Sequence, residues 1–130
     1  YVYVWKKNPI ASKSSVSLQE LEKYPCLTFD QGKTNSFYFA EEVFSTYEYK
    51  QTIQVDDRAS MLNLMVGLNG YTLCSGIICE ELNGSDYAAV PLKETEVMTI
   101  GYVKRKSIQL SELAQLYVNE LAKYKKLVLK

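Results

Sequence analysis

The segment from Thr52 to Gly76 constrains the fold of this chain more than any other part of it. Thr52 to Val55 has the composition of a short strand, the aspartates Asp56-Asp57 interrupt it, and Ala59 to Val66 has helical spacing. Gly67 to Gly70 then ends the helix before a second apolar run. The order strand, helix, strand is the repeating unit of open α/β sheets.

Strand and helix patterns alternate along most of the remaining chain. Strands are predicted at Tyr1 to Trp5, Cys26 to Phe29, Tyr87 to Leu92 and Val97 to Val103, and helices at Ser17 to Tyr24, Phe37 to Tyr47, Ile77 to Leu82 and Leu110 to Lys126. The first of these helices opens on a capping box, Ser17-Leu18-Gln19-Glu20. The first strand is so densely apolar that we expect it to be covered on both faces. Together these patterns predict a three-layer α/β fold with a largely parallel sheet.

Charge and composition exclude several classes of protein. Fifteen basic and fifteen acidic side chains cancel, so the chain lacks the net positive field of a typical nucleic-acid binder. No apolar run reaches the roughly 20 residues that span a bilayer, so no membrane partner is expected. Three cysteines make no even disulfide framework and no secretory segment opens the chain, which favours a reduced, cytoplasmic setting.

The sequence offers no catalytic constellation. It has no histidine, which excludes Ser–His and Cys–His catalysis and the common histidine-rich zinc sites. We therefore expect no enzyme activity, no metal and no cofactor, although the spacing of Cys74 and Cys79 leaves a three-thiol metal site open. Cys74 is expected to be an inert buried thiol, with redox sensing as the alternative.

Polar loops after the predicted strands are the candidate ligand site. In an open α/β sheet, small ligands bind beside the carboxyl ends of the strands, close to helix N-termini. Hydroxyl, amide and backbone N–H donors occur there in three segments, at Gln31 to Ser36, Asp56 to Ser60 and Thr72 to Ser75. Such donors suit a carboxylate, sulfate or phosphate group. Asp57 has the alternative role of capping its helix. The candidate ligand-binding residues are Gln31, Thr34, Asn35, Ser36, Asp57, Thr72 and Ser75.

Several short motifs occur in the order of a known family. Asn8-Pro9-Ile10-Ala11 follows a hydrophobic strand, Val16 to Leu21 is followed by Tyr24-Pro25, and Gly70 to Ser75 is an apolar run after a glycine turn. In this order over nearly the whole chain, and with Val90-Pro91-Leu92 behind them, they resemble the effector-binding domain of LysR-type transcriptional regulators. Two departures stand out. Leu68-Asn69 replaces part of the glycine turn, where asparagine can adopt the left-handed conformation, and Ser75 replaces a proline, which suggests a polar or anionic ligand.

The resemblance implies a fold similar to one lobe of the type 2 periplasmic-binding-protein fold, with one antiparallel crossover strand in a mostly parallel sheet. It assigns residues 12–93 to the second lobe, 1–7 and 97–104 to crossover strands at the hinge, and 108–127 to a helix of a first lobe outside this chain. It also implies a small-molecule effector bound between the lobes, a homodimer or higher oligomer, and DNA contact only through an N-terminal helix-turn-helix module outside this chain. The alternative is a solute-binding domain of a transport system, which shares the fold.

Overall fold

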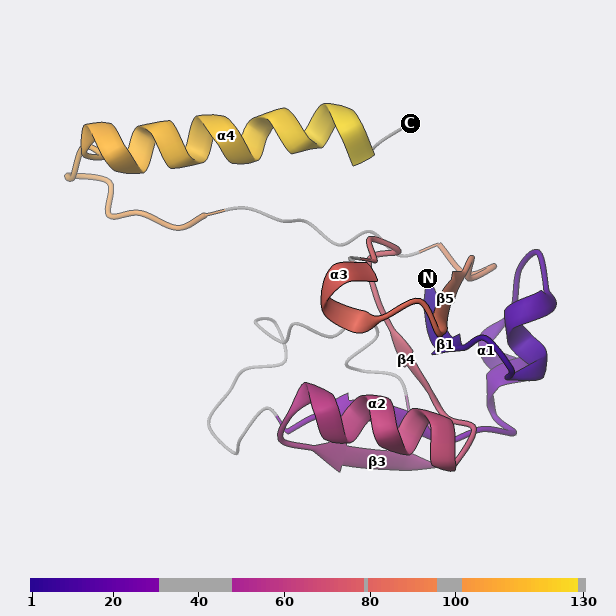
Figure 1. The fold of residues 1–130 in the computed structure, drawn as a ribbon. Coiled ribbons are helices and arrows are strands. Elements are labelled where there is room, and N and C mark those ends of the chain that lie inside the picture. The colour runs from indigo at the N-terminus through magenta and orange to yellow at the C-terminus, as the bar shows by residue number, and fades with distance from the viewer. Residues whose placement is uncertain (31–47, 79, 96–101, 129–130) are drawn as a thin grey trace. The chain divides into compact units, whose positions relative to one another are not determined.

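The computed structural model describes residues 1–30, 48–78, 80–95 and 102–128 of the 130-residue chain (Figure 1). The chain divides into two compact units, Tyr1–Met98 and Thr99–Lys130. The predicted helix at Phe37 to Tyr47 and most of the predicted strand at Val97 to Val103 lie outside the described residues. At the end of that second prediction, Tyr102 and Val103 belong to no regular element.

The first unit is built on one mixed sheet. Its strands in the described chain are β1 (Val2–Trp5), β2 (Cys26–Phe29), β3 (Thr52–Val55), β4 (Tyr71–Leu73) and β5 (Tyr87–Val90), in the spatial order β3-β2-β4-β1-β5. β2 is parallel to both β3 and β4, whereas β1 is antiparallel to both β4 and β5. The predicted α/β class is confirmed, and the sheet is mixed, with β1 running against its neighbours.

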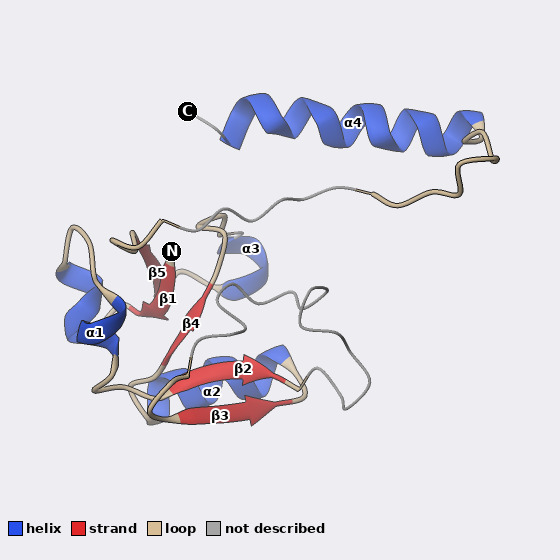
Figure 2. Ribbon diagram, turned by 180° about the vertical axis from the view of Figure 1, so that it is seen from behind, coloured by secondary structure: helices blue, strands red, loops and turns tan. Residues whose placement is uncertain are grey.

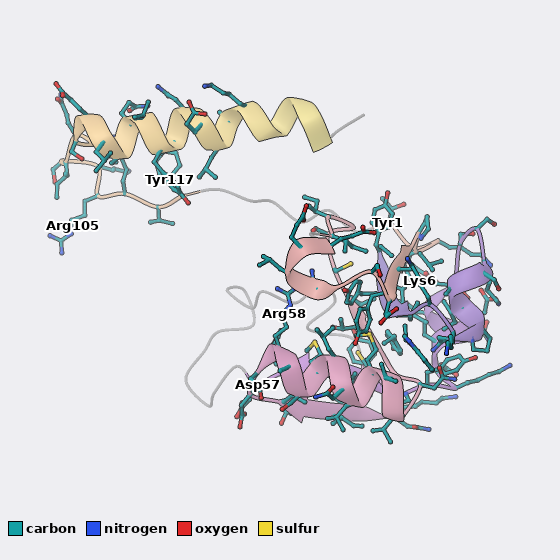
Figure 3. All side chains as sticks on the ribbon, viewed as in Figure 1. Tyr1, Lys6, Asp57, Arg58, Arg105 and Tyr117 are labelled. Carbon is teal, nitrogen blue, oxygen red and sulfur yellow. The ribbon has the colours of Figure 1, made fainter. Side chains whose placement is uncertain are left out.

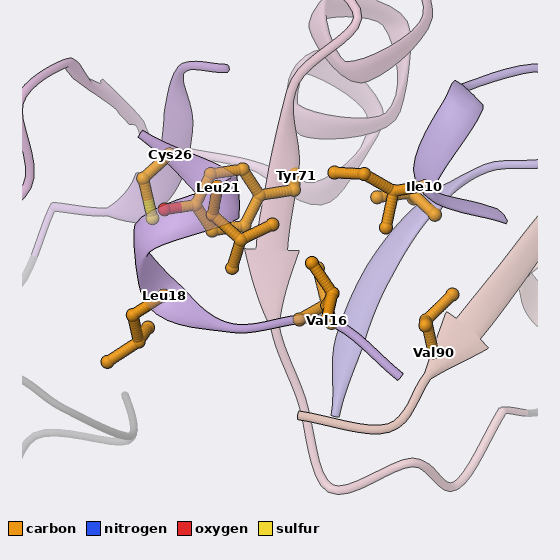
Figure 4. Close-up of a cluster of buried hydrophobic side chains, with 9 residues drawn as sticks. Ile10, Val16, Leu18, Leu21, Cys26, Tyr71 and Val90 are labelled. Carbon is orange, nitrogen blue, oxygen red and sulfur yellow. The ribbon is translucent and has the colours of Figure 1, made fainter. Parts of the chain in front are cut away.

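Apolar side chains lie on both faces of this sheet, because successive residues of a strand point to opposite faces. From β1, Val2 and Val4 join Ile10 and Leu21 in a cluster on one face, which Figure 4 shows in close-up. Tyr3 points to the other face and joins a second cluster, in which Met61 and Met65 of α2 (Arg58–Gly67) pack on Leu27 and Val55. β1 is therefore buried on both faces, as predicted.

Two short helical segments lie with the first cluster. The 3₁₀ helix η1 (Pro9–Ser12) was not predicted, and the Asn8 side chain caps it by accepting a hydrogen bond from the Ile10 N–H at 2.8 Å. α1 (Leu18–Leu21) has the predicted capping box, with Ser17 and Glu20 bonded to each other's backbone N–H. It ends before Tyr24, because the chain forms a tight turn ahead of Pro25 in which the Tyr24 N–H donates to the Leu21 carbonyl.

The α2 helix ends in the turn that the sequence indicates. Asn69 adopts the left-handed conformation with φ 56°, as predicted for the residue before the retained glycine. The Gly70 N–H then donates to the Met65 carbonyl at 3.1 Å, which satisfies one of the last helical carbonyls. A Cβ atom on Gly70 would lie 3.0 Å from the Pro25 carbonyl oxygen, so the tight packing here requires glycine.

Two predicted elements are shifted or shortened. The helix predicted at Ile77 to Leu82 is α3 (Glu80–Asn83), because a turn with Gly76 at φ 86° first carries the chain past the Tyr1 ring. β5 ends at Val90 instead of Leu92, because Pro91 has no N–H for the ladder. Leu92 instead forms an isolated parallel bridge with Val16.

The second unit contains α4 (Glu112–Val128), which confirms the predicted C-terminal helix with its start moved from Leu110. Ser111 caps it, since its Oγ accepts a hydrogen bond from the Ala114 N–H at 3.3 Å. One stripe of this helix is apolar and mostly exposed, and it includes Leu113, Leu116, Tyr117 and Leu121.

Candidate ligand site

The carboxyl ends of β2, β3 and β4 lie at one edge of the sheet, because these strands are parallel. Figure 2 shows β2 and β3 side by side and running in the same direction. Since β1 is antiparallel, its beginning reaches the same edge, where the Cys74 N–H donates to the Tyr1 carbonyl at 2.9 Å. The segments Asp56 to Arg58 and Cys74 to Gly76 therefore both lie at this edge, with β2 between the strands that they follow.

Asp57 is the N-cap of α2. Its Oδ1 accepts the Ser60 N–H at 2.9 Å and its Oδ2 accepts the Ser60 hydroxyl at 2.6 Å. These bonds, first that of the Ser60 side chain and then that of its backbone, hold the pKa of Asp57 below its usual value. The carboxylate thus occupies the N-terminus of α2 itself, which is the structural role considered for it. Contact between Asp57 and a ligand stays a prediction.

Thr72 is the middle residue of β4, and Ser75 follows the end of that strand. Thr72 is half-buried and pairs with Tyr3 of β1, so both side chains point to the face that α2 covers. Ser75 is exposed in the following turn, where its Oγ accepts the Ile77 N–H at 3.3 Å. Thr72 therefore lies one residue before the end of β4, on the face that α2 covers, and Ser75 lies beyond that end. Contact of either residue with a ligand remains a prediction.

The other four candidate residues, Gln31, Thr34, Asn35 and Ser36, lie outside the described residues. They follow β2 along the chain, after Asp30, whose N–H donates to the Val55 carbonyl at 3.0 Å. Their role in binding also remains a prediction.

Cys74 is a half-buried thiol with a weak local contact. The Gly76 N–H points to its Sγ at 3.4 Å, and burial raises the pKa of the thiol above its usual value. A raised pKa keeps the group protonated near neutral pH and therefore slow to react. This environment favours the inert role over redox sensing.

Two further residues of this region carry polar groups whose significance the sequence did not reveal. The sequence indicates only an apolar strand at Tyr3, yet its buried hydroxyl has no hydrogen-bond partner in the described chain. The sequence assigns no role to Arg58. The available signal was its position, because a cation in the first turn of a helix opposes the helix dipole.

A family model described as the LysR substrate binding domain matches residues 1–126. This chain belongs to the LysR substrate-binding domain family. The sequence resemblance is thereby confirmed, and the chain is a LysR-type regulatory ligand-binding domain. No curated protein matches its sequence.

Among the residues that the structure describes, no group of three histidine, cysteine or acidic side chains could hold a metal ion. Likewise, within the described ranges no helix is long and apolar enough to cross a membrane.

Proposed function

We propose that this domain senses a small polar or anionic effector at the edge where β2, β3 and β4 end. The match to the LysR substrate-binding family over residues 1–126 carries this proposal. The polar groups at that edge support it, because ligands of open α/β folds bind beside the carboxyl ends of the strands. Effector binding would favour one conformation of the domain and thereby control a DNA-bound oligomer.

Asp57 limits which groups of the proposed site can bind an anion. Its carboxylate already accepts both hydrogen bonds that Ser60 offers at the start of α2. An anionic effector therefore needs other donors, such as the Thr72 hydroxyl and the predicted loop from Gln31 to Ser36. The proposed role is binding without turnover, because a chain without histidine lacks the commonest general base.

The test is a thermal-shift screen against small anionic metabolites, amino acids and sulfur compounds. A ligand at 100 times its Kd stabilises the fold by about 2.7 kcal/mol, which is readily measured. We expect at least one compound to raise the melting temperature, and Ser36→Ala and Thr72→Ala to reduce that rise. Ser14→Ala removes a hydroxyl from an exposed position elsewhere and should leave it unchanged. A rise that is identical in all four proteins would contradict the proposed location.

A further inference from the structure

Tyr3 has a buried hydroxyl that makes no hydrogen bond within the described part of the chain. The residue is 5% exposed, and its ring stacks on Tyr87 with centroids 5.4 Å apart and an interplanar angle of 21°. The Tyr87 hydroxyl donates to the Leu62 carbonyl at 3.3 Å, whereas the Tyr3 hydroxyl has no partner in the part of the chain described. A buried donor without a partner is costly, and a phenylalanine would fill the same space without that cost.

Arg58 is the first residue of α2, three positions before Met61, which packs in the same cluster as Tyr3. Figure 3 shows its side chain extending from the start of α2 toward α3, whereas the neighbouring Asp57 points away. Burial raises the pKa of the Tyr3 hydroxyl, and the charge of Arg58 acts in the opposite direction, which is the effect of a nearby cation. Since the dipole of α2 disfavours a cation at its first residue, helix stability does not explain this arginine.

We propose that the Tyr3 hydroxyl and the Arg58 guanidinium together bind a carboxylate group of the effector. Both groups are hydrogen-bond donors at neutral pH, and the planar guanidinium fork matches the two oxygens of a carboxylate. Arg58 contributes one positive charge, which suits a singly charged group better than a phosphate dianion. This inference rests on the proposed effector-binding function and names the chemical class that the site selects.

Protein atoms cover the Tyr3 hydroxyl, so a ligand cannot touch it until they move. A carboxylate oxygen therefore makes the contact only after neighbouring side chains shift. The hydrogen bond then has a charged acceptor, and such bonds are stronger than those between neutral groups. Loss of the hydroxyl should therefore weaken binding by about tenfold or more.

The first test compares Tyr3→Phe with Tyr87→Phe in the full chain, using thermal unfolding with sodium acetate, succinate or glutamate. Tyr3→Phe should keep or raise the melting temperature without anions, because it removes an unpartnered group, yet lose most of the carboxylate-dependent shift. Tyr87→Phe should lower the melting temperature and retain that shift, because its hydroxyl is used by the protein. A fall of several degrees for Tyr3→Phe without anions would show that its hydroxyl has a protein partner, and would overturn the proposal.

The second test concerns Arg58. Arg58→Gln should abolish the carboxylate shift and Arg58→Lys should restore it only in part, because lysine keeps the charge without the planar fork. Arg105→Gln removes the same charge from an exposed position in the second unit and should leave the shift unchanged. Equal shifts with inorganic phosphate or sulfate would overturn the assignment to carboxylates.

The outcomes separate this inference from the proposed function. If the carboxylate shift survives in Tyr3→Phe and Arg58→Gln but is lost in Thr72→Ala, the inference fails and the effector site stands. If only uncharged compounds stabilise the wild-type chain, the inference also fails, while the proposed effector site still stands. If no compound of any class does so, both are contradicted.

Discussion

At the scale of single residues, the Asn8 side chain joins two segments that are 61 positions apart in the sequence. It is 2% exposed, accepts the Ile10 N–H at 2.8 Å and donates to the Asn69 carbonyl at 2.9 Å. One side chain thus fixes both η1 and the turn after α2. Its amide supplies both a donor and an acceptor.

Asn8→Ala should therefore lower the free energy of unfolding by about 2 to 4 kcal/mol, because two buried partners lose their hydrogen bonds. Asn63→Ala is the matched control, since that asparagine is exposed on α2 and alanine favours the helix. Urea denaturation of the three proteins measures the difference. Equal stability of Asn8→Ala and the wild type would show that these bonds add nothing.

Single residues also show what sequence patterns can and cannot predict. Ser17, Asp57 and Asn69 have their predicted roles because a cap or a turn depends on side chains within a few residues. The surroundings of the Tyr3 hydroxyl include the Tyr87 ring and the charge of Arg58. Strand pairing and helix packing bring these distant residues to it. No local pattern contains that information.

At the scale of elements, α1 is held by a cluster of charges around Glu20. Lys13 contacts Oε1 of this carboxylate at 2.5 Å, and Lys93 contacts Oε2 at 3.0 Å. The bond with Lys13, then those with the Ser17 backbone and Lys93, hold the pKa of Glu20 well below its usual value. Because the folded state binds this proton more weakly than the unfolded chain, the cluster stabilises the fold above the usual pKa of 4.5 and loses that effect as the pH falls below it.

Glu20→Gln should therefore lower the melting temperature near neutral pH, and the difference from the wild type should shrink as the pH falls from about 5 to about 3. Thermal unfolding at a series of pH values measures it. Glu48→Gln removes an equal charge from an exposed position outside this cluster, and serves as the control. A difference that is independent of pH would contradict the assigned role of the charge.

The turn between α2 and β4 offers a comparison of two glycines. A Cβ atom on Gly70 would lie 3.0 Å from the Pro25 carbonyl oxygen and 3.2 Å from a Leu27 methyl, whereas one on Gly67 would meet nothing within 4 Å. Gly70→Ala should cost about 1 to 3 kcal/mol in the free energy of unfolding. Gly67→Ala should be neutral or stabilising by up to about 1 kcal/mol, because alanine favours the helix. The reverse order in urea denaturation would refute this account of the turn.

At the scale of the whole molecule, the apolar stripe of α4 predicts self-association. Leu116 and Leu121 are 57% and 49% exposed, and a stripe of this length is seldom left in water. We expect sedimentation equilibrium to show an assembly larger than a monomer, and Leu116→Ser with Leu121→Ser to dissociate it. Gln115→Ser, on the opposite side of the helix, should not. A monomeric wild type at micromolar concentration would exclude association through this stripe.

The fold of the whole was predictable to a large extent, because alternating periodicities determine the α/β class. Strand order and the pairing of β1 with β4 and β5 depend on contacts between distant segments, and only the family resemblance anticipated an antiparallel crossover strand. Helix ends shifted where tertiary contacts intervened, as with the close approach of Tyr1 to Gly76 before α3.

The most direct test of an effector site at the carboxyl edge of the sheet is an NMR titration of the ¹⁵N-labelled chain with the best stabilising compound from the thermal screen. We expect the largest amide shifts at Asp56 to Arg58 and Thr72 to Gly76, with Asn8 and Asn69 at the opposite edge unchanged. Saturable shifts confined to that opposite edge, or no saturable shift at all, would contradict the account.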